Sequence, residues 1–137
     1  MSADKPKPTI DELRARKAER DAAAAKAVES REEEELLLEE AAIEKGFGKR
    51  GVDFEIVNTE VGCFLLTKPD FVTAKRFNAA EDKSEEEIIK FVTPSIKHPT
   101  TELSRQVFMA HGGVASRCAV ALISMYEARR RDRLGKY

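Results

Sequence analysis

Residues 52–67 read VDFEIVNTEVGCFLLT, and this stretch decides the fold. Apolar and acidic residues alternate from Val52 to Ile56, which is the pattern of a strand with one face in a core. A polar turn at residues 58–60 separates this strand from a second apolar run at residues 61–67. The stretch predicts a β-hairpin. Because an isolated hairpin is only marginally stable in water, helices from the rest of the chain are expected to cover it.

The sequence before the hairpin predicts one long helix over residues 10–45. This segment contains neither glycine nor proline and is built mainly of strong helix formers. Thr9 and Glu12 form a capping-box pattern at its start, and Gly46 provides a natural stop. At 1.5 Å per residue the helix would be ~54 Å long, so part of it must project or pack on another chain.

The first part of this helix is mainly polar, whereas its end is apolar. Val28 is the only large aliphatic residue between Arg14 and Glu35, and glutamates interrupt the heptad pattern of the alanines, which argues against a strong coiled coil. The end of the helix carries an apolar stripe that is expected to dock on the following domain: Leu36, Leu37, Leu38, Ala41, Ala42 and Ile43.

A short helix is predicted directly after the hairpin. Pro69 cannot continue the ladder of the second strand. Phe71, Ala74 and Phe77 then recur at intervals of three, which indicates a helix with one apolar edge. Residues 78–83 are expected to form its exit loop.

Three more helices complete the expected order of elements. Ser84 caps a helix that ends at Pro94, and residues 94–99 are expected to be a loop bracketed by prolines. The next helix begins near Thr101 and stops at residues 111–113. The last helix follows, and its expected apolar residues are Val114, Cys118, Ala121, Leu122 and Met125.

Together these elements predict an α+β fold that is mostly α, with a long N-terminal helix followed by a small domain of one β-hairpin packed with about four helices. The expected division is a disordered lead-in at 1–8, a long charged helix at 9–46 that serves as an oligomerisation or docking arm, a compact domain at 47–128 and a basic tail at 129–137.

Composition narrows the class of protein. The chain has 137 residues, of which 42% are hydrophobic and 36% charged, and its net charge of -1 gives no global field that would attract nucleic acid or an anionic membrane. No stretch approaches the ~20 apolar residues of a membrane span. Cys63 and Cys118 lack paired spacing and are expected to be free thiols in a reducing compartment, so a cytoplasmic location is expected.

No motif in the sequence supports catalysis, a cofactor or a metal. Residues 46–51, GFGKRG, match the dinucleotide fingerprint, but they follow a helix and precede a strand, so a helix cap and hinge explains them. The cysteines and histidines are scattered singly, whereas zinc ligands come in close pairs. The acidic runs are expected to be solvated, which does not favour general acid–base chemistry. The protein is therefore predicted not to be an enzyme and to need no cofactor.

The basic residues near the C-terminus allow two interpretations. Arg129, Arg130 and Arg131 could contact phosphates, which would make the protein a small nucleic-acid-binding regulator. The same arginines suit the end of a helix and complement the acidic segment of residues 32–40, which includes Glu32 and Glu33, in the same chain or in a neighbouring one. The absence of aromatic residues among the arginines makes nucleic acid the less favoured partner.

The order of parts from the hairpin onward resembles that of tail assembly chaperones of long-tailed bacteriophages. The resemblance rests on Leu65-Leu66-Thr67-Lys68-Pro69 running into Ala74-Lys75-Arg76-Phe77, then an acidic helix closing near Pro94 and a final pair of helices. It covers roughly residues 52–128. The long N-terminal helix is a departure from the family's usual short form.

The resemblance implies a non-enzymatic, commonly self-associating protein that keeps a long helical tape-measure client soluble during tail assembly, in the host cytoplasm if the protein is phage-encoded. An adaptable apolar groove would accept the client helix. Candidate partner-binding residues are Phe71, Phe77, Phe91, Met109 and Met125. Candidate oligomerisation or electrostatic contacts are Glu32, Glu33, Leu36, Leu37, Arg129, Arg130 and Arg131. The alternative to a chaperone is a structural subunit retained in an assembled particle, or the nucleic-acid-binding regulator.

Overall fold

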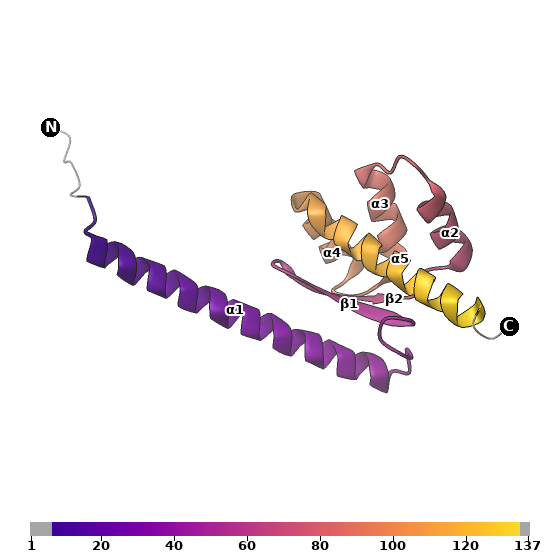
Figure 1. Ribbon diagram of the computed structural model, residues 1–137, viewed down its shortest axis with the longest axis horizontal. Coiled ribbons are helices and arrows are strands. Elements are labelled where there is room, and N and C mark those ends of the chain that lie inside the picture. The colour runs from indigo at the N-terminus through magenta and orange to yellow at the C-terminus, as the bar shows by residue number, and fades with distance from the viewer. Residues whose placement is uncertain (1–6, 135–137) are drawn as a thin grey trace.

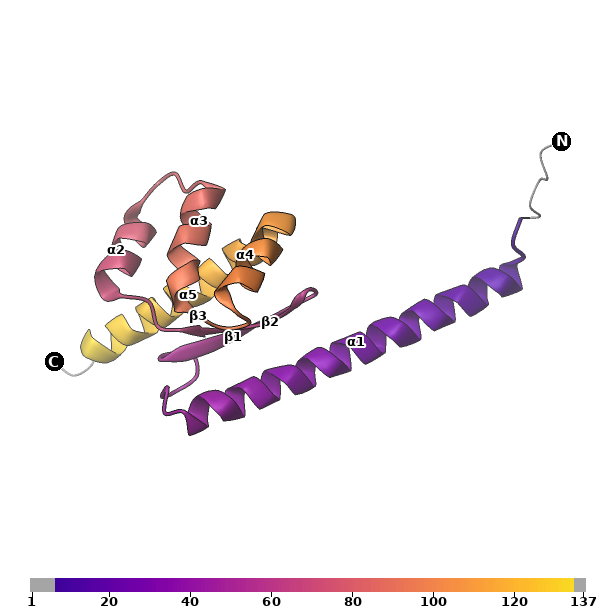
Figure 2. The ribbon, with the colours of Figure 1, turned by 180° about the vertical axis from the view of Figure 1, so that it is seen from behind.

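The chain folds into three layers, with a β-sheet between one long helix and four others (Figure 1). We describe a computed structural model that covers residues 7–134. Helix α1 (Ile10–Glu44) crosses one face of the sheet. The opposite face is covered by α2 (Phe71–Ala79), α3 (Glu85–Val92), α4 (Thr101–Ala110) and α5 (Gly112–Leu134). Figure 2 shows the same arrangement from behind.

Helix α1 begins and ends where the sequence predicts. The Thr9 hydroxyl accepts a hydrogen bond from the Glu12 backbone N–H, and the Glu12 carboxylate accepts one from the Thr9 N–H. After the helix, Gly46 has φ +76°, a left-handed conformation that glycine adopts without strain. The 35 residues make a rod ~52 Å long. Its first part, residues 10–30, is exposed and extends past the sheet (Figures 1 and 2).

The sheet has three antiparallel strands in the order β1 (Phe54–Thr59), β2 (Gly62–Thr67), β3 (Ile96–His98). The predicted hairpin forms β1 and β2, with Ile56 opposite Leu65. The central strand β2 pairs on its other side with β3, where Leu66 lies opposite Ile96.

Alternation along the strands builds two separate cores. Val57, Phe64 and Leu66 point into the larger core, which the four helices α2–α5 fill. The side chains between them point to the opposite face of the sheet and form a smaller core with α1 and the segment after it. This smaller core contains Leu38, Ala42, Phe47, Phe54, Ile56, Cys63 and Leu65.

The predicted fold class, α+β and mostly α with a long N-terminal helix, is confirmed. One detail of the sheet was wrong, because residues 94–99 are not only a loop. A 3₁₀ turn, Thr93–Ser95, leads into β3, which makes the sheet three-stranded. A strand of three residues is too short for its alternation to be read, and it exists because Ile96 is buried against the larger core.

The arginines near the C-terminus belong to α5. The expected basic tail at 129–137 is helical as far as Leu134, because α5 continues through the arginines. Long cationic side chains favour helix and suit a helix C-terminus, so nothing stops the helix earlier. Residues 135–137 lie outside the described residues, as does most of the predicted disordered lead-in at 1–8, which the structure describes only from Lys7.

Candidate protein-binding surfaces

A groove runs along α5 on the side of the sheet away from α1. The lining residues of α5 recur on one face from Ser116 to Arg131, a length of about 22 Å at 1.5 Å per residue. The opposite wall comes from α2, the loop after it and α3. We call this hollow of about 490 Å³ the α5 groove; its apolar lining consists of Phe77, Ile88, Ala119, Val120 and Ile123.

Phe77, which lines the α5 groove, stacks on a second aromatic ring. The Phe77 ring lies parallel to that of Phe91, with 4.0 Å between the ring centroids and 9° between the planes. The Lys83 ammonium lies 4.8 Å from the Phe77 centroid, within range of a cation–π interaction. Phe91 is buried and Phe77 is half-buried, so the stack links the groove wall to the core.

The exposure of the α5 face makes it available to a partner. Val120 has 66% of its surface exposed, and the neighbouring groove residues Ile123 and Phe77 are half-buried. The charged residues of the lining are Lys83, Glu127 and Arg131. A largely apolar trough along a helix is the form of a helix-binding groove.

The five predicted partner-binding residues do not lie together. Phe77 lines the α5 groove. Phe91 and Met125 belong to the larger core, with 6% and 0% exposure, so their burial argues against direct contact with a partner. Phe71 lies beyond the other side of α5 against Tyr126, and Met109 is exposed beside α3 on α4.

Sequence reasoning missed the two most informative groove residues, Val120 and Ile123. The apolar residues expected on this helix were Val114, Cys118, Ala121, Leu122 and Met125; Ala121 is half-buried and the other four are buried. The signal for the groove was present: the apolar residues of this helix extend beyond one face, and at 100° per residue Val120 and Ile123 fall outside the core stripe.

The outer side of α1 carries a second exposed apolar surface. Leu36, Leu37 and Ile43 are 58–62% exposed, whereas only Leu38 and Ala42 of the predicted stripe pack on the sheet. The expectation that the whole stripe docks was wrong, because six apolar residues within eight positions surround more than one face of a helix. We call the exposed face the α1 ridge; it consists of Leu36, Leu37 and Ile43 together with Glu29, Glu32, Glu33, Glu40 and Glu44, all exposed.

The predicted electrostatic contacts lie on opposite faces of the molecule. Glu32 and Glu33 are on the α1 ridge, while Arg129, Arg130 and Arg131 are on α5, across the sheet (Figure 1). Among residues 7–134 no ion pair joins the two groups. A contact between them therefore requires a second chain.

The arginines at the end of α5 border a further hollow, of about 340 Å³. Arg129 and Arg133 line it with Lys68, and the Arg133 guanidinium lies 5.6 Å from the Phe71 ring centroid. Asp70, which caps α2 by accepting a hydrogen bond from the Thr73 N–H, also lines it. This end of the molecule is locally basic although the chain as a whole is not.

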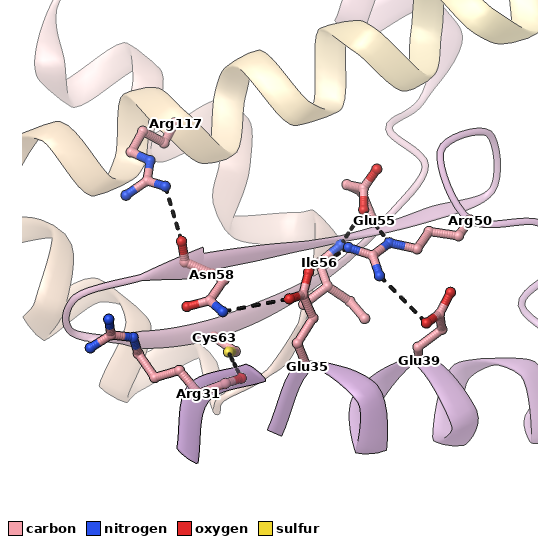
Figure 3. A network of polar contacts seen from close by, with 9 residues as sticks. All are labelled: Arg31, Glu35, Glu39, Arg50, Glu55, Ile56, Asn58, Cys63 and Arg117. Atoms are coloured by element: carbon pink, nitrogen blue, oxygen red, sulfur yellow. Dashed lines mark hydrogen bonds and ion pairs between the residues drawn. The ribbon is translucent and has the colours of Figure 1, made fainter. Parts of the chain in front are cut away.

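Arg50 connects α1 to the sheet (Figure 3). Its guanidinium lies 2.6 Å from a Glu35 oxygen, 2.7 Å from Glu55 and 3.5 Å from Glu39. The contacts continue through Glu35 to the Asn58 side chain at 3.5 Å, and the Arg117 guanidinium of α5 donates to the Asn58 carbonyl at 2.9 Å. A polar chain thus joins the two helical layers past the edge strand β1.

The charge on Arg50 is firmly held. Partial burial alone would lower the pKa of the guanidinium, but its hydrogen bonds to Glu55 and Glu35 outweigh that effect and raise the pKa above its usual value. Arg50 lies inside the glycine-rich segment that resembles a dinucleotide fingerprint, and its three carboxylate contacts give this segment a structural role.

Both cysteine thiols are inactivated by burial. Burial, with smaller contributions from Glu34 and Glu35, raises the pKa of Cys63 to about 11, and burial raises the pKa of Cys118 to about 12. The Cys63 thiol lies beneath α1, 3.4 Å from the Arg31 carbonyl oxygen. A thiol must be ionised to act as a nucleophile, so neither position suits covalent catalysis.

Within residues 7–134, no group of three or more His, Cys, Asp and Glu side chains is placed to hold a metal ion. None of the helices in this range has both the length and the apolar composition needed to cross a membrane. Comparisons of the chain with protein families, curated proteins and solved structures gave no match. The functional proposal therefore rests on the two exposed apolar surfaces.

Proposed function

We propose that this protein is a non-enzymatic assembly factor that binds a helical segment of another protein in the α5 groove. The observation that carries the proposal is the groove itself, an apolar trough about 22 Å long on one face of α5. A compact small molecule would not need a trough of that length, whereas about four turns of an amphipathic helix would span it and place leucine-like residues along it.

The resemblance to tail assembly chaperones of long-tailed phages suggests the kind of client. A tape-measure-like client presents long helices that need protection from aggregation until the tail tube surrounds them. The charged exterior of this chain, with 36% charged residues, would keep such a complex soluble in the cytoplasm. The role is one of stoichiometric binding without turnover.

A direct test uses a fluorescein-labelled synthetic peptide with leucine at positions i, i+3, i+4 and i+7, chosen because it aggregates in water. Fluorescence anisotropy measures binding, and light scattering measures whether the protein keeps the peptide in solution. We expect binding by the natural chain and strong weakening in Val120→Glu, which puts a charge into the groove. Leu103→Glu on α4 is the matched control, because Leu103 is 52% exposed and outside the groove.

Two results would overturn this proposal. One is no binding and no effect on scattering by the natural chain. The other is equal binding by the natural chain and Val120→Glu, which would place the peptide elsewhere. Circular dichroism on each variant establishes that the substitution leaves the fold intact.

The exposed α1 ridge favours a second candidate, a structural subunit that stays in an assembled particle. Three aliphatic side chains that are 58–62% exposed on one face of a long rod are typical of a surface that is covered in an assembly. Stable incorporation at fixed stoichiometry, measured by sedimentation of the assembled particle, would distinguish a subunit from a chaperone that is released.

A further inference from the structure

The two exposed apolar surfaces differ in charge. Between residues 29 and 44 the α1 ridge carries five glutamates and no basic residue on the same face. The charged residues that line the α5 groove are Lys83, Arg131 and Glu127, a net charge of +1, and further arginines follow in the last turns of α5. The ridge is therefore acidic and the groove is basic.

The distance along the helix from the central apolar residues to the outer charged residues is similar on the two surfaces. Leu36 and Ile43 are two turns apart on the ridge, about 10 Å at 1.5 Å per residue. Val120 and Ile123 occupy the middle of the groove, and Arg131 lies about 12 Å further along α5 than Ile123. Glutamates lie at similar distances from the leucines on both sides, Glu29 before them and Glu44 after them, so either helix direction places a glutamate opposite the arginines.

The sheet separates the two surfaces, since α1 covers one face and α5 the other (Figures 1 and 2). One molecule cannot bring its own ridge into its own groove. Two molecules can do so, and each pair leaves one groove and one ridge unused.

We infer that the α5 groove binds the α1 ridge of a second copy of this chain, which stacks copies head to tail. This inference rests on the proposed function, because it concerns the same groove. The second copy would occupy the groove when no client is bound. Because the contact joins two different patches, it is heterologous and generates an open stack or a ring. A contact made by one helix face lies at the small end of protein interfaces, so the association depends on concentration and on salt.

Two glutamate substitutions test this on the whole chain. Leu36→Glu adds a charge to the ridge, and Val120→Glu adds one to the groove; both side chains are more than 60% exposed, so the fold tolerates the change. Leu103→Glu is again the control. Multi-angle light scattering over a concentration series, at low and high salt, gives the molar mass of each.

The expected result for the natural chain and Leu103→Glu is a molar mass that rises with concentration and falls with salt. Leu36→Glu and Val120→Glu should each remain monomeric. An equimolar mixture of the two should reach twice the monomer mass and stop there, because one intact groove and one intact ridge remain between them.

The inference is overturned if the natural chain is monomeric at every concentration up to its solubility limit. It is also overturned if either variant associates like the natural chain, or if the mixture stays monomeric while the natural chain associates. The proposed function is judged separately: Leu36→Glu has an intact groove, so peptide binding by this variant shows whether the groove accepts a helix even where self-association fails.

Discussion

The Arg50 guanidinium lies 2.6 Å from the Glu35 carboxylate, and this contact ties the long N-terminal helix to the sheet. Glu39 on the same helix and Glu55 on β1 approach the same guanidinium. These side chains are 24–32% exposed, so the pairs are screened less than pairs at an open surface. The apolar contribution of α1 to the same seam is small, mainly Leu38 and Ala42.

Replacing Arg50 with alanine should loosen α1. Three carboxylates would face one another without their shared cation, and we expect a loss of roughly 1–2 kcal/mol in unfolding free energy. Cys63 provides a local reporter, because α1 covers it, whereas Cys118 lies in the larger core. A disulfide reagent at pH 8 should label Cys63 faster in Arg50→Ala and Cys118 at an unchanged rate. Arg105→Ala is the control, because Arg105 is an exposed residue of α4. Equal labelling of Cys63 in the two variants would contradict this role.

The buried thiols predict how stability depends on pH. The folded-state pKa values of Cys63 and Cys118, about 11 and about 12, lie above the ordinary value of 9.0. Their contribution to stability is therefore complete below pH 9 and is lost as the pH rises through the folded-state values. The denaturant concentration at the unfolding midpoint should therefore decrease as the pH is raised from 9 to 11. The fall should be smaller in a Cys63→Ala, Cys118→Ala double variant.

The Phe77–Phe91 stack predicts unequal costs for two similar substitutions. Phe91→Ala removes a buried ring and should cost ~3–5 kcal/mol. Phe77 is only half-buried, so Phe77→Ala should cost less, roughly 1–3 kcal/mol, including the lost stacking. Urea denaturation measures both. A larger loss for Phe77→Ala than for Phe91→Ala would be inconsistent with this packing.

Gly48 is required by the turn between α1 and the sheet. It has φ +113°, and a Cβ atom there would collide with the Asp53 side chain, which accepts a hydrogen bond from the Lys49 N–H at 2.8 Å. Gly48→Ala should cost about 1–3 kcal/mol. Gly113→Ala is the matched control: it is helical, nothing lies near the added carbon, and it should be neutral or stabilise by up to about 1 kcal/mol. Similar thermal midpoints for the two variants would refute the requirement.

Truncation should separate the two parts of α1. A chain beginning at Ser30 loses only exposed residues of the rod and should keep its unfolding free energy within about 0.5 kcal/mol. A chain beginning at Gly46 uncovers Ile56, Cys63 and Leu65 and should be much less stable or aggregate. Denaturation of both chains measures the difference, and equal stability would show that α1 is not part of the fold.

Local patterns explain what could be predicted from the sequence. The Thr9 cap, the stop at Gly46 and the alternation around Ile56 depend on neighbouring residues, and the structure contains each of them. The strand at Ile96 was missed because its pairing with Leu66 connects residues thirty positions apart. The ion pairs of Arg50 were missed for the same reason, since Glu35 lies in another element.

The candidate site was only partly predictable. An apolar groove and a complementary acidic segment were expected, and Phe77 and Leu36 belong to the corresponding surfaces. Which aromatic residues line the groove depends on how α2 and α3 pack against α5. Periodicity within one helix does not contain that information, so Met125 was expected at a surface from which it is excluded.

Helix α1 is synthesised before every strand on which it packs. A ribosome adds about 5–20 residues per second, so the finished helix waits for seconds until β2 and then β3 have emerged. A strongly apolar helix would be prone to aggregate during that wait. Helix α1 docks partly through the ion pair between Arg50 and Glu35. The nascent helix can therefore stay hydrated and still dock once the sheet is complete.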